Sequence, residues 1–119
     1  MDDIKSYRDL EVWQVAMDLS EMVYELTSKL PSEELFGLKS QARRSVVSIP
    51  SNIAEGRARK GKAEFLHHLS IARGSLAELE TQLLLTVRLK FIARESLAPV
   101  WAKAQSVGKL LTALIKSLR

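Results

Sequence analysis

The chain has 119 residues, with 18 Lys or Arg against 14 Asp or Glu, which gives a formal net charge of +4 at pH 7. This length is enough for one domain, residues 1–119, with a hydrophobic core of its own. Because the chain has no cysteine, disulfides, thiolate zinc sites and cysteine nucleophiles are excluded, and a cytoplasmic location is expected. Residues 1–5 lack the start of a signal peptide. No uncharged apolar stretch reaches the roughly 18 residues that span a bilayer, so no membrane partner is expected.

Charge is separated along the chain. Residues 1–34 carry nine acidic and three basic side chains, whereas residues 35–73 carry two acidic and eight basic ones. Residues 74–119 carry three acidic and seven basic side chains. This separation favours an anionic partner for the middle segment, or an acidic surface of another subunit, over ordinary solvated faces.

Helical spacing of apolar residues defines the first half of the chain. The first expected helix covers residues 10–29 and ends before Pro31. Ser32 is expected to cap the second helix, with two glutamates following it in the first turn. Pro50 falls inside this second helix and is expected to kink it without ending it.

The second half of the chain predicts two more helices. The third covers residues 62–91, with apolar residues three and four positions apart over its whole length. The fourth follows Ser96 as a cap, and Pro99 fits in its first turn. Because the connections are short, consecutive helices are expected to be antiparallel. The sequence therefore predicts an all-α fold, an antiparallel up-down-up-down four-helix bundle.

Two helices carry more apolar surface than one bundle can bury. A second stripe on the first helix is formed by Leu10, Trp13, Met17 and Tyr24. The third helix carries a comparable set away from its main seam, namely Ile71, Leu85, Leu89 and Ile92. Burying both stripes requires another subunit, so a homo-oligomer is expected. Head-to-tail contacts that close into a ring are favoured, and a twofold dimer through the first helix is the alternative.

Polar side chains form facing stripes on the second and third helices. If the turn near residue 60 sets the register, Asn52 and Glu55 lie near His68, Ser48 lies near Ser75, and Arg44 lies near Glu78 or Gln82. We interpret these residues as a structural hydrogen-bond network that fixes helix register. Its predicted members are Gln41, Arg44, Ser48, Asn52, Glu55, His68, Ser75 and Glu78. Gly74, beside Ser75, is expected to let a neighbouring backbone approach closely.

The alternative for these polar residues is catalysis or metal binding by His68. Glu55, Glu64 or Glu78 would supply the carboxylate. The chain has no His-x-x-x-His pair and no Gly-rich phosphate loop. No catalytic residue, metal ligand or cofactor site is therefore predicted.

A basic segment marks the turn between the second and third helices. No acidic residue interrupts this segment before Glu64. Clustered cations at the end of a bundle suit contacts with nucleic-acid phosphates. No aromatic residue interleaves the cluster, so base stacking is not implied, and a simple solubilising turn is the alternative. The predicted nucleic-acid-binding residues are Arg57, Arg59, Lys60 and Lys62 in the turn, extended by Arg43 and Arg73 on the adjoining faces.

Several segments together carry a family resemblance. They are Tyr7-Arg8-Asp9-Leu10-Glu11-Val12-Trp13-Gln14-Val15-Ala16, Leu30-Pro31 with Phe36-Gly37-Leu38, Gln41 with Arg43-Arg44, Ser48 to Gly56, and Gly74 to Leu83. The chain resembles the four-helix bundle proteins of 23S rRNA intervening sequences, also called the S23 ribosomal protein family. The resemblance implies a four-helix subunit and, from known relatives, a homopentameric ring, with no established enzymatic activity.

The chain is similar also to the accessory variability proteins of diversity-generating retroelements. These proteins form basic pentameric barrels that engage nucleic acid and a reverse transcriptase, and they supply a mechanism by analogy. The leading hypothesis is a non-enzymatic oligomeric scaffold that binds RNA or DNA nonspecifically through the basic turn. A protein-interaction adaptor without a nucleic-acid role is the alternative, and a hydrolase or nuclease using His68 is a third.

Overall fold

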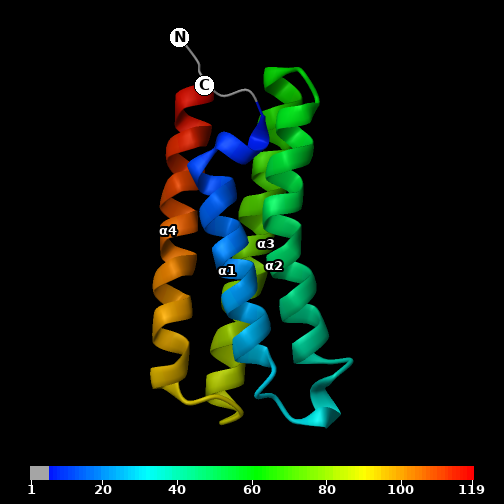
Figure 1. The fold of residues 1–119 in the computed structure, drawn as a ribbon, viewed down its shortest axis with the longest axis vertical. Coiled ribbons are helices and arrows are strands. Elements are labelled where there is room, and N and C mark those ends of the chain that lie inside the picture. The colour runs from blue at the N-terminus through cyan, green and yellow to red at the C-terminus, as the bar shows by residue number, and fades with distance from the viewer. Residues whose placement is uncertain (1–5) are drawn as a thin grey trace.

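A computed structural model describes residues 6–119, in which four long helices stand side by side (Figure 1). The helices are α1 (Glu11–Thr27), α2 (Leu38–Ala58), α3 (Lys62–Arg88) and α4 (Arg94–Leu118). Two short 3-10 helices, η1 (Tyr7–Asp9) and η2 (Ser32–Glu34), precede α1 and α2. No β-strand occurs in residues 6–119. The expected all-α, up-down-up-down bundle is confirmed.

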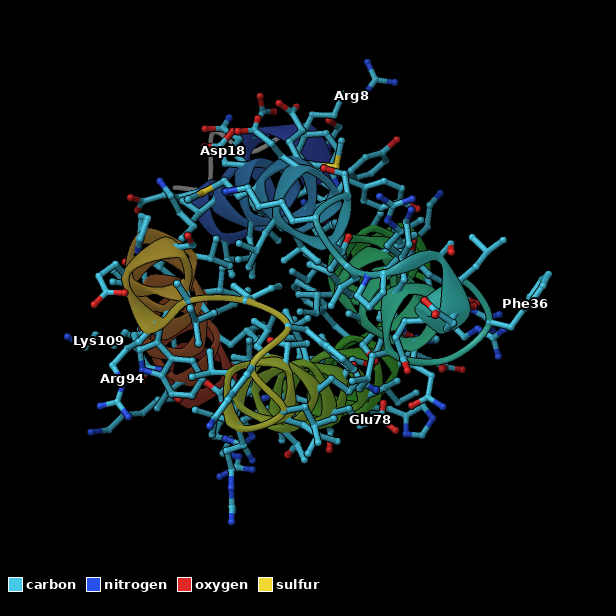
Figure 2. The ribbon with its side chains drawn as sticks, turned by 90° about the horizontal axis from the view of Figure 1, so that it is seen from below. Arg8, Asp18, Phe36, Glu78, Arg94 and Lys109 are labelled. Carbon is cyan, nitrogen blue, oxygen red and sulfur yellow. The ribbon has the colours of Figure 1, made fainter. Side chains whose placement is uncertain are left out.

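The four helices form a closed square in which each helix packs against two others. α1 contacts α2 and α4, while α3 contacts the same two helices from the opposite side, and the α2–α3 contact is the most extensive. Side chains from all four helices fill the space between them (Figure 2). The largest fully buried apolar residues come from the positions that helical spacing selects, namely Leu19, Val23, Val46, Ile49, Ile53, Leu69, Leu79, Leu83, Val107 and Leu111.

The second helix begins later than the sequence predicts. Ser32 lies in η2 and does not cap α2, which starts at Leu38 after Gly37. The Leu38 amide donates to Oε1 of Glu34 across 3.0 Å, so a carboxylate takes the capping role expected of Ser32. A Cβ atom at Gly37 would lie 2.6 Å from the same oxygen, so a larger residue here would shift the Glu34 carboxylate away from the cap. Farther on, α2 continues through Pro50, which does not end it.

The connection from α3 to α4 also differs from expectation. α3 ends at Arg88, and Lys90 adopts a positive φ of 66° that turns the chain away from the helix axis. This turn folds Ile92 back onto the core, so its assignment to the outer apolar set of the third helix is wrong. α4 then starts at Arg94, and its N-cap Ala93 lies three residues before the predicted cap Ser96. Pro99 consequently lies beyond the first turn.

The outer apolar stripe of α1 is shorter than the sequence predicts. Leu10 is only 7% exposed and packs in the core, so it is not available to another subunit. The physical reason is that Leu10 precedes α1 in an extended conformation, where helical spacing does not apply. Trp13 is half-buried and packs edge-on against Tyr7. Met17 and Tyr24, at 39% and 44% exposure, remain on the surface.

Candidate nucleic-acid interface

The basic turn lies at the end of the bundle that also holds η1 and the C-terminal end of α4 (Figure 1). α2 ends at Ala58 and α3 begins at Lys62, with Gly61 as an extended N-cap that makes no side-chain capping bond. Arg59, Lys60 and Lys62 are exposed, and Arg57 is half-buried. The short turn therefore presents several cations to solvent at one end of the molecule.

One cation of the turn is paired with an acid of its own helix. Nη2 of Arg59 lies 2.8 Å from Oε2 of Glu55, one helical turn earlier, and about half of each side chain is exposed. The sequence prediction considered only acids within the segment itself and missed Glu55. An exposed pair of this kind contributes little to stability and can open when a phosphate competes for the guanidinium.

Arg43 does not extend the basic turn, contrary to the sequence prediction. It lies 16 residues before Arg59 on the same helix, which is about 24 Å along the axis at 1.5 Å per residue. Its guanidinium donates from Nε to Oγ1 of Thr27 and from Nη2 to the carbonyl of Tyr24, both at 3.0 Å. It also lies over the Tyr24 ring, 4.4 Å from the centroid. These contacts bind the side chain of Arg43, which belongs to α2, to α1.

Arg73 is also separate from the turn. It is exposed on α3 and lines a groove of about 470 Å³ with α4 residues that include Gln105 and Lys109. Figure 2 shows Lys109 pointing outward from α4. The six predicted nucleic-acid residues therefore occupy three places, and only the four in the turn form one cluster.

Behind the turn, a chain of hydrogen bonds joins α2 to α3. Nδ2 of Asn52 donates to the carbonyl oxygen of Ser48 at 2.9 Å and to its Oγ at 3.0 Å. The Oγ atoms of Ser48 and Ser75 lie 2.9 Å apart. Oδ1 of Asn52 lies 3.0 Å from Nδ1 of His68. Because the amide nitrogen already faces Ser48, the oxygen must face His68, which assigns the hydrogen to Nδ1 of the imidazole.

The other predicted members of this network lie at its margin. Gln41, Arg44 and Glu78 are exposed around a polar cleft of about 350 Å³ between α2 and α3. Figure 2 shows Glu78 pointing outward. Glu55 lies 3.9 Å from Nε2 of His68 but pairs with Arg59. Gln82, which also lines the cleft, keeps a buried Oε1 without a hydrogen-bond partner. The exposed members of the predicted network, Gln41, Arg44 and Glu78, thus reach water, whereas its buried and half-buried members bond to each other.

His68 has its imidazole directed into this layer. It is 8% exposed, and its two ring nitrogens face Asn52 and Glu55. Among residues 6–119, no group of three His, Asp or Glu side chains is placed to hold a metal ion. The geometry of the histidine suits a helix-joining role, with one nitrogen committed to the Asn52 amide.

The close helix approach occurs at Gly56, not at Gly74. A Cβ atom at Gly56 would lie 2.7 Å from Cβ of His68 and 3.1 Å from Cδ1 of Phe65, so α3 occupies the space of a side chain. At Gly74 nothing lies within 4 Å of the same position, and the predicted close approach is absent within the subunit. In the sequence, Gly56 lies between the polar residues of the second helix and the basic turn. The spacing of residues alone does not show which of the two glycines packs against a neighbouring helix.

A second cationic surface, which the sequence did not predict, lies at the opposite end of α2 from the basic turn. A cleft of about 530 Å³ is lined there by Tyr24, Leu35, Phe36, Lys39, Ser40, Arg43, Arg44 and Val47. Its aromatic residues come from α1 and from the connection before α2, so they are not interleaved with the cations along the sequence. Only folding brings the two kinds of side chain together.

Comparison with known proteins decides the family. The model of the 23S rRNA-intervening sequence protein family matches residues 8–113, which is most of the chain. The chain belongs to this family. A search of curated protein sequences found no match. None of the helices in residues 6–119 has the length and apolar character needed to cross a membrane.

A solved structure supports membership of the 23S rRNA-intervening sequence family. It is a protein with unknown function from the S23 ribosomal protein family of Bacteroides thetaiotaomicron, 28% identical to this chain. The match has a TM-score of 0.82 and covers 88% of this chain and 98% of the other. The similarity therefore extends over most of the chain.

Proposed function

We propose that this member of the 23S rRNA-intervening sequence family is a non-enzymatic, oligomeric helical scaffold that binds RNA or DNA nonspecifically. The observation that carries the proposal is the cluster of Arg57, Arg59, Lys60 and Lys62 at one end of the bundle. Phosphate neutralisation by such side chains releases counterions and needs no base contact. The turn is therefore suited to binding without sequence preference.

Oligomerisation would multiply this binding. The described surface carries exposed apolar side chains on α1 and on the outer side of α3 and its C-cap, namely Met17, Ile71, Leu84, Leu85 and Leu89. The α1 stripe lies among acidic residues, and the α3–α4 side carries Arg88 and Arg94, so the two faces are complementary in charge. We propose a head-to-tail homopentamer on these faces. Repeating the basic turn around a ring raises avidity without new contacts.

Salt dependence of binding tests the proposal. Fluorescence anisotropy of a labelled RNA duplex should show tight binding at low salt, with a log–log salt slope of about −3 to −4 if three or four phosphates are neutralised at each turn. The fourfold variant with Arg57, Arg59, Lys60 and Lys62 changed to Ala should lose this binding. A matched variant that removes four cations outside the turn and outside the proposed subunit faces should retain it, using Lys29, Lys103, Lys109 and Lys116. Binding that is insensitive to salt, or equal in both variants, would contradict the proposal.

A protein-interaction adaptor is the second candidate. An apolar groove of about 570 Å³ between α3 and α4 favours it, with Leu84, Val87, Leu97 and Trp101 on its walls and Arg88 and Arg94 at its edge. The resemblance to retroelement accessory proteins suggests a reverse transcriptase as a partner to test. Co-purification that survives nuclease treatment and is lost in Leu84→Lys would favour the adaptor.

A further inference from the structure

The cleft at the lower end of α2 combines aromatic and cationic side chains in one place. Tyr24 projects from α1, Phe36 from the connection before α2, and Lys39, Arg43 and Arg44 from the first turns of α2. Arg43 and Arg59 are separated by about 24 Å of helix, so this cleft is distinct from the basic turn. The proposed function does not account for it.

Phe36 has the most exposed large apolar side chain among the described residues, at 90%. Figure 2 shows its ring pointing away from the bundle, beyond the end of α2. The ring is not among the buried or partly buried side chains of the core, so it contributes little to the stability of the fold. An aromatic ring presented in this way offers its face to a flat ligand.

Tyr24 provides a second ring, and Arg43 holds it in place. The guanidinium lies 4.4 Å from the ring centroid and is itself fixed by its bonds to Thr27 and to the Tyr24 carbonyl. The ring is nevertheless 44% exposed. Ring and guanidinium are therefore fixed in position before any ligand arrives, which lowers the entropy cost of binding.

The charge of the cleft is positive. Lys39 is half-buried and Arg44 is exposed, and both lie within one helical turn of Arg43. Glu33 and Glu34 are the acids of the adjoining connection, and the Glu34 carboxylate accepts a hydrogen bond from the Leu38 amide as the helix cap. Cations beside exposed aromatic rings are the features that recognise unpaired nucleotides, in which the bases stack on rings and the phosphates contact Lys or Arg.

We propose that this cleft binds a single-stranded segment of RNA or DNA. Bases stack on Phe36 and Tyr24, and the neighbouring phosphates contact Lys39 and Arg44. Bases inside a duplex are stacked on each other and cannot occupy these positions, so the cleft confers a preference for unpaired strands. The basic turn contacts phosphates only and confers no such preference, which separates the two sites experimentally.

Binding of two nucleic acids, compared between the wild-type protein and three variants, tests the cleft. The full-length protein is titrated into labelled oligo(U) and into an RNA duplex of equal length, at one fixed salt concentration. Phe36→Leu, which keeps an apolar side chain without a ring, should weaken oligo(U) binding by about 5- to 150-fold, because stacking contributes that much per base. Duplex binding should not change. Phe36→Trp should restore oligo(U) binding, and Thr112→Ala, at an exposed position of α4 outside the cleft, should have no effect.

Two outcomes would overturn the proposal. One is oligo(U) binding that is unchanged in Phe36→Leu. The other is a lower solution mass of this variant by light scattering, which would make Phe36 a contact between copies of the chain. If only the proposed role of the basic turn is wrong, the results differ from both of these. The fourfold turn variant then still binds the duplex, while Phe36→Leu still has weakened binding to oligo(U).

Discussion

Asn52 on α2 and His68 on α3 face each other across the most extensive helix contact of the bundle, with Oδ1 and Nδ1 3.0 Å apart. The same Asn52 amide donates to the backbone and side chain of Ser48, whose Oγ contacts Ser75. The Asn52 side chain thus bonds three groups on two helices, and Ser48 extends the chain of bonds to Ser75. Apolar seams tolerate sliding between helices, whereas this chain of bonds is satisfied in a single register.

Asn52→Ala should destabilise the fold by about 1–3 kcal/mol, because it leaves half-buried groups of Ser48 and His68 without partners. The check is urea denaturation followed by circular dichroism, at one fixed protomer concentration, since oligomers unfold in a concentration-dependent way. Gln41→Ala is the matched control because Gln41 is exposed on the same helix. Equal midpoints for the two variants would count against the register role.

Gly56 and Gly74 should respond in opposite ways to substitution by alanine. Gly56→Ala places a methyl group 2.7 Å from Cβ of His68, so the helices must separate, at a cost of about 1–3 kcal/mol. Gly74→Ala meets nothing within 4 Å and should stabilise α3 by about 0.5–1 kcal/mol through helix propensity. Thermal unfolding of both variants measures the difference. A destabilised Gly74→Ala with a reduced solution mass would instead place Gly74 at a contact between subunits.

Substitutions at Leu10 and Met17 should affect different properties, the first the stability of the fold and the second the assembly of subunits. Leu10→Ala removes a buried side chain and should cost about 2–5 kcal/mol in the free energy of unfolding. Met17→Lys changes an exposed residue, so helical content should be retained while the mass by multi-angle light scattering falls toward that of one 13.4 kDa subunit. A wild-type protein that is already monomeric would refute the proposed ring.

Arg43→Lys should weaken the attachment of α1 to α2 while keeping the charge. The guanidinium donates to Thr27 and to the Tyr24 carbonyl at once, and a lysine cannot reproduce this two-pronged geometry. We expect a loss of about 1–2 kcal/mol in stability, measured by chemical denaturation. Duplex RNA affinity should not change, because Arg43 lies far from the basic turn. A clear loss of duplex affinity would show that Arg43 contributes to duplex binding, as the sequence predicted.

Much of the architecture follows from local rules. Apolar residues three and four positions apart predict the helices, and short connections make them antiparallel. The tight turn after Arg59 also sets the register that brings Ser48 opposite Ser75 and Asn52 opposite His68. Helix ends were less predictable, because the cap of α2 comes from the Glu34 carboxylate and the end of α3 depends on the left-handed conformation of Lys90.

The sequence by itself determined the helical bundle, its family resemblance and the position of the basic turn, because these depend on spacing and on residues adjacent in the chain. Only the tertiary structure decided that Leu10 and Ile92 are buried, that Gly56 is the point of close approach and that Arg43 is bound to α1. It also assembled the cleft of Phe36, Tyr24 and Arg44. The physical reason is that burial, clashes and composite surfaces depend on how helices pack, whereas helical periodicity is a property of each helix alone.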